Sequence, residues 1–326
     1  MIIVTGATGF IGSNLVADLN ALGRDDLVLV DDLGTKGKWR NIAKRRFQDI
    51  VSPADTRGFL GGLSGAEMVY HLGANSSTTA VDGDEILRNN FGTSKLFWEW
   101  CARTRTPLIY ASSAATYGAG ATGFMDDQST AALDALRPLN LYGWSKHAFD
   151  KWAIMQNAAG AAPPQWCGLK YFNVFGPNEY HKGDMQSLVA KNAPRIAAGL
   201  PVPLFKSYRE DFRDGEQLRD FIYVKDCTRV MLWLASQPQV NGLFNLGTGH
   251  ARSFVDLIEA TGRALDKTVS IEFTDMPESI RANYQYFTCA AMEKLKRAGY
   301  SRPFYTLEEG VADYVRDYLV RADTHR

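Results

Sequence analysis

The chain has 326 residues, of which 45% are hydrophobic, and its 36 basic side chains balance its 36 acidic ones. A chain of this length and composition can bury a complete core, and we expect a soluble globular protein with two lobes. Because the formal net charge is zero, the sequence gives no support for a nucleic-acid partner or for an anionic membrane surface.

The start of the chain and its cysteines indicate a cellular compartment. Met1 leads directly into "IIVTGATGFIG", without a charged leader or a cleavable apolar segment. No apolar run approaches the ~20 residues that cross a bilayer. The four cysteines are scattered without CxxC spacing, and the five histidines form no metal-ligand cluster. We therefore expect a cytoplasmic protein with reduced thiols, no metal and no membrane partner.

In the first half of the chain, short apolar segments alternate with helical patterns. The apolar segments are rich in β-branched and aromatic residues and lack strict alternation, which is typical of strands buried on both faces. They span residues 1–5, 27–31, 68–74, 107–113 and 168–176. The helical patterns span residues 11–23, 89–104 and 145–158. This alternation predicts an α/β fold with a doubly wound parallel (Rossmann) sheet.

The second half of the chain has a different rhythm. Residues 178–218 are rich in loops, strand character returns at 221–227 and 243–249, and an amphipathic helical pattern spans 306–320. We expect a smaller C-terminal α/β lobe at the end of the sheet. The predicted domains are a nucleotide-binding domain over 1–177, to which 219–249 returns, and a substrate-binding lobe over 178–326.

Three glycines follow the first predicted strand. Gly6, Gly9 and Gly12 in "TGATGFIG" stand between that strand and the first helix. Glycines there allow a tight turn, a close approach of the backbone to a pyrophosphate, and close packing of helix against strand. The helix N-terminus offers free N–H groups to the phosphate. The GxxGxxG spacing favours a short-chain dehydrogenase type of dinucleotide site over the GxGxxG type.

The end of the second strand leaves the choice between NAD and NADP open. Asp31 stands nineteen residues after Gly12, where an acidic residue accepts from the adenosine ribose hydroxyls and favours NAD. Lys36, Lys38 and Arg40 follow closely, and a 2′-phosphate requires such cations.

A tyrosine and a lysine stand four residues apart in "PLNLYGWSKHAFD". Tyr142 and Lys146 share one face of the predicted helix because residues i and i+4 are neighbours there. An ammonium beside a phenol lowers the pKa of the phenol, which is otherwise near 10. The pair is therefore a candidate acid–base device, although such a pair also arises often by chance on a surface helix.

The order of motifs resembles the extended short-chain dehydrogenase/reductase family that acts on nucleotide sugars. The motifs are "TGATGFIG", "HLGANSSTT", "NNFGT", "YASSAATYG", "LYGWSK", "KYFNVFGPNE", "RDFIYVKD" and "NLGTG". Within that family, "SSAATYG", "NVFGPNEYHKGDMQS" and "NYQYFT" are most similar to the branch that inverts C6″ of ADP-heptose for the lipopolysaccharide core. The resemblance implies a homo-oligomer, with a pentamer as one arrangement, and a tightly held NADP that is regenerated in each cycle.

The resemblance also implies roles for individual residues. The implied catalytic residues are Ser113, Tyr142, Lys146 and Lys182. The implied cofactor-binding residues are Gly6, Gly9, Phe10, Ile11, Gly12, Asp31, Asp32, Lys38, Leu72, Gly73, Ala74, Asn75, Ser76, Asn89, Lys146, Val174 and Lys182. The implied substrate-binding residues are Asn173, Asp184, Lys191, Phe205, Lys206, Ser207, Tyr208, Arg219 and Tyr284. The chain departs from the family at Pro53, where relatives carry a lysine near the adenosine phosphate, and Arg57 is the candidate substitute.

The chemistry expected of these parts is a transient oxidation. Tyr142 takes the hydroxyl proton while the carbinol C–H gives its hydride to the nicotinamide, and the hydride returns to the opposite face of the ketone. A 4,6-dehydratase is disfavoured, since Thr116 is followed by Tyr117 and Gly118 instead of an Asp-Glu pair. A UDP-sugar 4-epimerase remains an alternative, with NAD as the alternative cofactor. A non-catalytic NADP-sensing regulator is expected to lose Tyr142 or Lys146, and both are present.

Overall fold

A computed structural model describes residues 1–281 and 284–326 of the chain. Its main sheet has seven strands. They are β1 (Ile2–Thr5), β2 (Leu27–Val30), β3 (Asp49–Val51), β4 (Met68–His71), β5 (Leu108–Ser113), β6 (Trp166–Tyr171) and β10 (Gly242–Leu246). All of them pair in parallel, in the order β10-β6-β5-β4-β1-β2-β3. The predicted doubly wound parallel sheet is confirmed.

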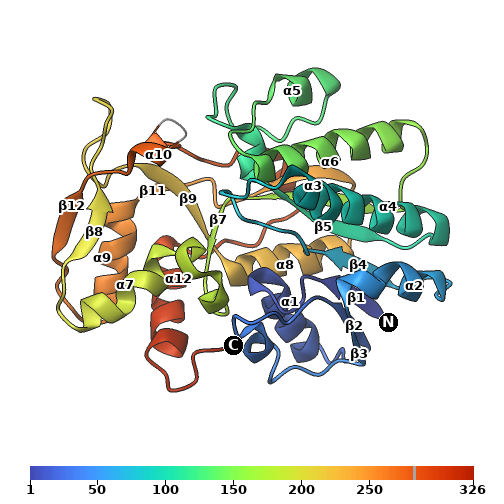
Figure 1. Ribbon diagram of the computed structural model, residues 1–326, viewed down its shortest axis with the longest axis horizontal. Helices are drawn as coiled ribbons and strands as arrows, with labels where there is room; N and C mark the ends of the chain where they lie inside the picture. The colour runs from blue at the N-terminus through green and yellow to red at the C-terminus, as the bar shows by residue number, and fades with distance from the viewer. Residues whose placement is uncertain (282–283) are drawn as a thin grey trace.

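Helices cover both faces of this sheet. They are α1 (Phe10–Ala21), α2 (Thr56–Gly61), α3 (Gly83–Ile86), α4 (Thr93–Thr104), α5 (Thr130–Ala135), α6 (Leu141–Ala158) and α8 (Val224–Ala235). Figure 1 shows α4 and α6 on one side of the sheet and α1 and α8 on the other. Trp98 of α4 packs against Phe149 and Trp152 of α6, with ring centroids 6.2 and 5.9 Å apart. This aromatic packing fixes α6 in place beside β5.

A second group of elements lies beyond the carboxyl ends of the strands (Figure 1). Its strands are β7 (Asn173–Phe175), β8 (Val202–Phe205), β9 (Leu218–Tyr223), β11 (Ala251–Ser253) and β12 (Ile271–Thr274). Its helices are α7 (Leu188–Ala197), α9 (Phe254–Ala264), α10 (Glu278–Arg281) and α12 (Leu307–Tyr314), whereas α11 (Glu293–Arg297) packs against β10 of the main sheet. Strands β11, β9 and β7 form one small sheet, and β12 and β8 form another.

Six short 3₁₀ or π segments complete the described chain. They are η1 (Lys38–Asn41), η2 (Pro53–Asp55), η3 (Leu87–Gly92), η4 (Ala114–Tyr117), η5 (Tyr180–Met185) and η6 (Val315–Leu319). The C-terminus lies beside α1 (Figure 1), where Arg326 pairs with Asp18. Thr324 accepts a 2.7 Å hydrogen bond from the hydroxyl of Tyr180 through its carbonyl oxygen. The last residues therefore pack against η5.

Some element bounds differ from those predicted. The segment expected as a strand over 221–227 changes to helix α8 at Val224, and Asp226 stands in the first turn of that helix, where a carboxylate is favoured by the helix dipole. The strand expected over 168–176 is broken at Phe172, whose N–H donates to Leu246 of β10. Asn283, the first residue of "NYQYFT", lies outside the described residues.

Candidate active site

The glycine-rich turn between β1 and α1 brings three backbone segments close together. Gly6 has a φ of +64°, and a Cβ there would lie 2.7 Å from the backbone nitrogen of Gly73. A Cβ on Gly12 would lie 2.1 Å from the carbonyl oxygen of Gly6. Both positions therefore require glycine, because turn, helix and the loop after β4 leave no space for a side chain.

The first turn of α1 opens on a cavity of about 770 Å³. Gly9, Phe10, Ile11 and Gly12 line this cavity. The first N–H groups of a helix have no partner within the helix and carry the positive end of its dipole. Gly9, at the N-cap, makes no side-chain cap. The geometry thus leaves the N–H groups free for an anion such as a pyrophosphate.

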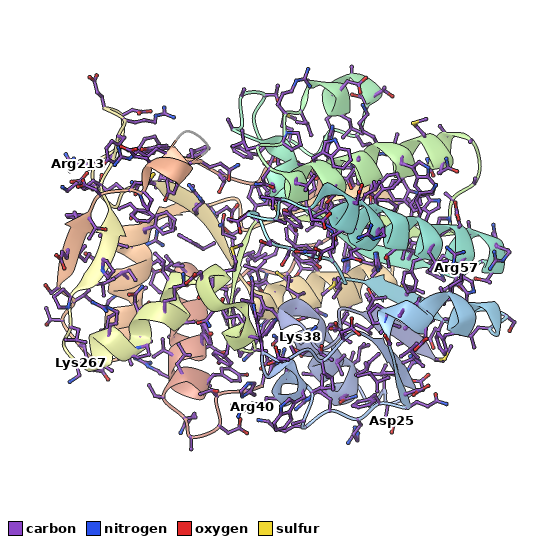
Figure 2. All side chains as sticks on the ribbon, in the orientation of Figure 1. Asp25, Lys38, Arg40, Arg57, Arg213 and Lys267 are labelled. Carbon is purple, nitrogen blue, oxygen red and sulfur yellow. The ribbon has the colours of Figure 1, made fainter. Side chains whose placement is uncertain are left out.

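Asp31 and Lys38 stand together at one end of the cavity. Asp31 accepts from the backbone N–H of Thr8 at 2.9 Å, from the Thr8 hydroxyl at 2.6 Å and from the Lys38 ammonium at 2.7 Å. Asp31, Lys38 and Lys36 line the cavity, whereas the exposed Asp32 does not. Figure 2 shows Lys38 near the middle of the molecule and Arg57 toward one side, on α2.

The loop after β4 forms one wall of the cavity. Leu72, Gly73, Ala74, Asn75 and Ser76 all line it, as do Ser77 and Thr78 beyond them. The side chain of Asn89, which was predicted to bind the cofactor, is exposed and lies outside the cavity lining. The adjacent Asn90 is buried instead, accepts from the Asn75 N–H at 2.8 Å, and donates to Asn75 at 3.0 Å and to Ser145 at 2.9 Å. Asn90 therefore holds the loop without entering the cavity.

Ser113, Tyr142 and Lys146 all line the cavity. Ser113 ends β5, and Asn140 caps the N-terminus of α6 by accepting from the Gly143 N–H at 2.8 Å. The cap and the aromatic packing of α6 set the first two turns of this helix against β5. Lys146 donates a 2.7 Å hydrogen bond to the carbonyl oxygen of Ala111.

Burial dominates the protonation of these groups. It raises the pKa of the Tyr142 phenol, and a hydrogen bond with Ser113 acts in the opposite direction. Burial also lowers the pKa of Lys146 to about 8. The expectation that Lys146 would bring the phenol pKa below 10 is not met in the protein alone, because the desolvation of the phenol outweighs its polar contacts.

Lys182 reaches the cavity from η5. Its Nζ lies 5.3 Å from the centroid of the Phe10 ring, and burial lowers its pKa while the neighbouring Glu179 acts in the opposite direction. Glu179 is buried and accepts from the N–H and the hydroxyl of Ser187 at 2.6 and 2.7 Å. These bonds tie η5 to the start of α7.

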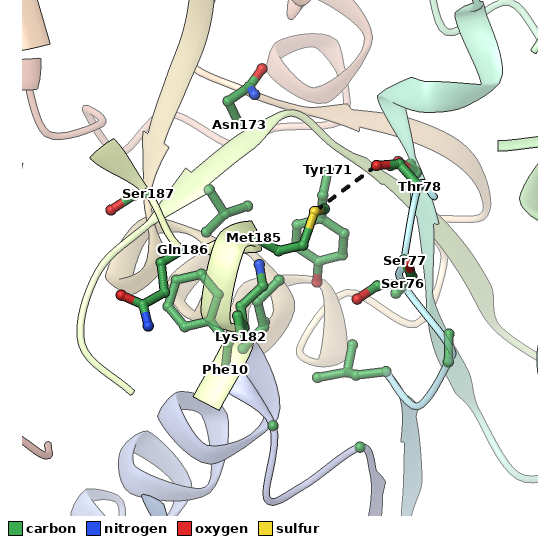
Figure 3. Close-up of a pocket in the computed structure, with 18 of the residues that line it drawn as sticks. Phe10, Ser76, Ser77, Thr78, Tyr171, Asn173, Lys182, Met185, Gln186 and Ser187 are labelled. Carbon is green, nitrogen blue, oxygen red and sulfur yellow. Dashed lines mark hydrogen bonds between the residues drawn. The ribbon is translucent and has the colours of Figure 1, made fainter. Parts of the chain in front are cut away.

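The two walls of the cavity touch each other at Thr78 and Met185. The Thr78 hydroxyl points to the Met185 sulfur at 4.0 Å, as the dashed line in Figure 3 shows. Tyr171 and Lys182 lie on the same side of this contact, and Asn173 lies beyond it (Figure 3). The contact thus joins the loop after β4 to η5.

The predicted substrate residues divide into groups. Asn173 and Val174 of β7 line the cavity, whereas Arg219 lies in an aromatic cluster beside it. The Arg219 guanidinium lies 5.5 Å from the ring of Phe254 and 5.3 Å from that of Tyr284. Phe205 packs against Tyr284 at 6.3 Å. Since Phe254 also lines the cavity, this aromatic cluster around Arg219 adjoins the cavity.

The remaining predicted substrate residues lie outside the cavity. Lys206 pairs with Asp275 at 3.2 Å, and the Tyr208 hydroxyl donates to the same carboxylate at 3.1 Å. The Ser207 N–H donates to Asp214 at 2.7 Å. These contacts fold the 205–208 loop onto neighbouring segments. The exposed Lys191 donates to the carbonyl oxygen of Asp184 at 2.5 Å, so neither residue faces the cavity.

Several cavity residues were missed in the sequence. Thr78, Met185 and Gln186 stand within motifs that were recognised, so their motif membership was an available signal. Phe254 and Leu257 of α9 carried no such sequence signal, because an apolar helix face is equally typical of core packing. The missed lining residues are Ser77, Thr78, Ala111, Ser112, Tyr171, Phe172, Phe175, His181, Met185, Gln186, Ser187, Leu188, Phe221, Phe254 and Leu257.

The fold and the cavity define an enzyme of the doubly wound α/β class with a dinucleotide site. The cavity lies where the strand order reverses beside β1, the place at which doubly wound folds bind dinucleotides. It is lined by the N-terminus of α1, the carboxylate of Asp31, and the side chains of Tyr142 and Lys146. The sequence matches the NAD dependent epimerase/dehydratase family over residues 2–247. The chain belongs to this family.

Similar proteins refine this assignment. The chain is 47% identical to the ADP-L-glycero-D-manno-heptose-6-epimerase of Fusobacterium nucleatum over 334 residues, with 100% of both chains covered. Its fold matches the Helicobacter pylori ADP-L-glycero-D-manno-heptose-6-epimerase with a TM-score of 0.79 at 26% identity, covering 97% of this chain and 95% of that one. The Thermus thermophilus UDP-glucose 4-epimerase complex with NAD has a TM-score of 0.75 at 25% identity, with 97% of both chains covered. The predicted resemblance to nucleotide-sugar epimerases is confirmed.

The described residues also bear on contact with membranes and metal ions. None of the helices within 1–281 and 284–326 is both long enough and apolar enough to span a membrane. The same residues contain no group of three or more His, Cys, Asp or Glu side chains placed to hold a metal ion.

Proposed function

We propose that this chain inverts C6″ of ADP-D-glycero-D-manno-heptose to give ADP-L-glycero-D-manno-heptose, by transient oxidation with bound NADP, in the supply of heptose for lipopolysaccharide. The observation that carries the proposal is that Tyr142, Lys146 and Lys182 line one cavity in a chain whose full length matches an enzyme of that name. A UDP-sugar 4-epimerase is the alternative activity.

The cavity offers a place for each part of a dinucleotide. The free N–H groups of α1 suit the pyrophosphate, the glycine-lined turn lets the ligand approach the backbone, and Asp31 with Lys38 stands where the adenosine ribose would lie. A bound nicotinamide would supply the acceptor and the donor of the hydride at C6″, and its positive charge would favour the phenolate of Tyr142.

The side chains of the cavity carry the proton transfers. Tyr142 takes the proton of the C6″ hydroxyl as the carbon becomes a ketone, while Ser113 hydrogen-bonds the same oxygen. Inversion requires the ketone to present its other face, so its oxygen moves to a second position. Lys182, which enters the cavity from η5, protonates the oxygen there, and its lowered pKa makes it a better proton donor than an ordinary lysine.

NADP is the proposed cofactor. Lys36 and Lys38 both line the adenosine end of the cavity, and two cations beside Asp31 give a 2′-phosphate a favourable site. The exposed Arg57 lies outside the cavity lining, so in this proposal it does not replace the family lysine that is absent at Pro53.

The proposed organisation follows the same division of labour. Residues 1–177 with 219–249 bind the cofactor, and 178–326 bind the substrate.

We also propose a cytoplasmic homo-oligomer, with a pentamer as one arrangement. The four free cysteines, three of them buried, support a reducing compartment. Exposed apolar side chains such as Trp144 and Met155 of α6 give a subunit contact a place to form. A monomeric mass measured by light scattering at working concentration would contradict the proposed oligomer.

Product analysis tests the activity. Mass spectrometry first identifies the nucleotide that co-purifies, and we expect NADP. The protein is then incubated separately with ADP-D-glycero-D-manno-heptose and with UDP-glucose, and the products are resolved at the inverted carbon. Inversion of the heptose, absent in Tyr142→Phe, supports the proposal. Inversion at C4 of UDP-glucose alone would replace it with the alternative activity.

A further inference from the structure

A buried ion pair lies directly behind the acid–base pair. Asp150 of α6 and Lys170 of β6 are 3.4 Å apart, and their side chains are 0% and 1% exposed. Buried charges are costly, and apolar residues of the same size are often as stable as a buried ion pair or more so. The pair is therefore not explained by stability alone.

Every polar atom of Asp150 is engaged by a neighbouring element. Its two carboxylate oxygens accept from the Tyr110 hydroxyl at 3.0 Å and from the Ser112 hydroxyl at 2.7 Å. Lys170 in turn donates to the Thr116 hydroxyl at 2.9 Å. The network thus joins α6 to β5 and β6, and the bonds hold Asp150 in one position.

This network is continuous with the catalytic wall. Tyr142, Lys146 and Asp150 are spaced four residues apart on α6, so they share one face of the helix. Ser112 lines the cavity, and the preceding Ala111 accepts the hydrogen bond of Lys146. Asp150 therefore fixes strand β5 through Ser112, and β5 in turn accepts the hydrogen bond of Lys146. Asp150 also places a negative charge one helical turn after Lys146.

We propose that Asp150, held by Lys170, is a positioning residue that keeps the buried Lys146 protonated and directed at the cofactor side of the cavity. The inference rests on the proposed function of Tyr142 and Lys146 as the acid–base pair. Its physical basis is that a desolvated ammonium tends to lose its proton unless an anion stands nearby.

The charges around Lys146 support this role. Burial lowers the pKa of Lys146 to about 8, and the charge of Asp150 acts in the opposite direction. His71 of β4 has its pKa lowered to about 3 by burial and by Lys146, so it adds no positive charge near neutral pH. His147 of α6 also has a lowered pKa.

Two more titratable groups border the network. Asp126 is one of them. Burial lowers the pKa of Lys170, whereas the charges of Asp150 and Asp126 act in the opposite direction. The Tyr142 phenol is the remaining group, and its pKa is raised by burial, so it is neutral in the free protein. Among these described neighbours, Asp150 is the anion that acts on Lys146.

Two substitutions are expected to move Lys146 in opposite directions. Asp150→Asn removes the anion and leaves Lys170 as an unbalanced cation, so the Lys146 pKa should fall by ~1 unit or more. Lys170→Gln removes the cation that balances Asp150, so the Lys146 pKa should rise. Lys170→Arg keeps the charge and should restore the native value. In the pH profile of epimerisation, the limb governed by Lys146 should shift in the same two directions.

The direct measurement is the pH titration of the ¹³Cε resonance of Lys146 by NMR, assigned through its absence in Lys146→Arg. Asp226→Asn is the matched control, since Asp226 is a buried carboxylate on α8 that pairs with Arg229 at 3.1 Å. This control should leave the Lys146 titration unchanged even where stability falls.

Shifts of opposite sign in the two variants, absent in the control, support the proposal. Equal titrations in all variants, or shifts of the same sign, would overturn it. If Asp150→Asn does not fold, Lys170→Gln and Lys170→Arg still decide the sign. Because the titration needs no sugar substrate, a wrong substrate assignment would appear in the product analysis while the opposite shifts remained.

Discussion

Asp31 and Lys38, which both line the cavity, form an ion pair of 2.7 Å. The two residues favour different cofactors, because a carboxylate accepts from the ribose hydroxyls of NAD and an ammonium binds the 2′-phosphate of NADP. The pair means that either ligand must compete with an existing contact. We therefore expect the relative affinity for NAD and NADP to depend on whether Asp31 and Lys38 keep their ion pair or contact the bound cofactor.

Reversing the charge of Lys38 tests that balance. Lys38→Glu removes a charge-assisted hydrogen bond to the phosphate and adds a repelling carboxylate beside Asp31. Loss of such a bond costs ~1.5–3 kcal/mol, so we expect NADP affinity to fall by ~10-fold or more relative to NAD. Calorimetric titration of cofactor-free protein with both dinucleotides gives the ratio. Arg57→Glu is the control on exposed α2, and a ratio changed by Arg57→Glu alone would transfer the discrimination to that residue.

A methyl group at Gly12 should disturb the cofactor site from within. A Cβ there would lie 2.1 Å from the Gly6 carbonyl oxygen, so Gly12→Ala must push α1 away from the turn. Overpacking of this kind costs ~1–3 kcal/mol, and we expect both a lower thermal midpoint and weaker dinucleotide binding. Gly58→Ala in α2 is the matched control, since a Cβ at Gly58 meets nothing within 4 Å. Equal behaviour of the two variants would show that the turn adapts freely.

The fold was predictable to the extent that each strand carried its own signal. The buried strands β1, β2, β4, β5 and β6 are apolar runs, and alternation with helices sets a parallel sheet. Strand β3 has three residues, two of them exposed, and such a segment has no pattern to recognise. Strands β8 and β12 are short and pair across about seventy residues, and a pairing of that kind is decided by tertiary contacts.

The candidate site was predictable where backbone geometry demands a residue type. Gly6 and Gly12 are visible because sterics require glycine, and Tyr142 and Lys146 because their spacing is that of a helix. Asn89 and Asn90 could not be distinguished in this way, because they are identical neighbours in the sequence. Both lie in the π-helical segment η3, where Asn90 is buried and Asn89 is exposed. The placement of the 205–208 loop depends on the ion pair of Lys206 with Asp275 and on the hydrogen bond from the Ser207 N–H to Asp214, and no local pattern indicates either contact.

A neutral histidine at the base of the site should make the protein sensitive to acid. His71 is buried between the Thr5 hydroxyl at 2.7 Å and the Ser94 hydroxyl at 2.9 Å. Ser94 gives its own proton to the Asn90 carbonyl oxygen, so His71 donates to Ser94 and accepts from Thr5 in this network. A second proton on the ring would break the bond from Thr5, and burial lowers the His71 pKa to about 3.

The sign of the pH effect follows from this lowered pKa. An unfolded histidine binds its proton near pH ~6.5, so between pH 6.5 and about 3 the unfolded state holds the extra proton. The free energy of unfolding should therefore fall as the pH drops below ~6.5, by up to ~1.4 kcal/mol per unit for this group. Urea unfolding at ~pH 7.5 and ~pH 5 measures the slope. His71→Gln should flatten it, and exposed His250→Gln should not; equal slopes in both variants would assign the acid sensitivity elsewhere.

Inversion at one carbon should require both Tyr142 and Lys182. The two residues come from different elements, α6 and η5, and line the same cavity. Proton transfer requires contact within ~3 Å, and one phenol held on a capped helix is not expected to serve two positions of the ketone oxygen. Tyr142→Phe and Lys182→Met should each fold, retain nucleotide and lose epimerisation by at least ~100-fold, the low end for general acid–base catalysis. Lys151→Met is the control, because Lys151 is an exposed lysine of α6 that pairs with Asp134. The rates are compared after cofactor occupancy has been confirmed for each variant. A Lys182→Met rate within a few-fold of the native rate would leave Tyr142 as the only proton carrier, and the ketone would then have to turn within reach of a single phenol.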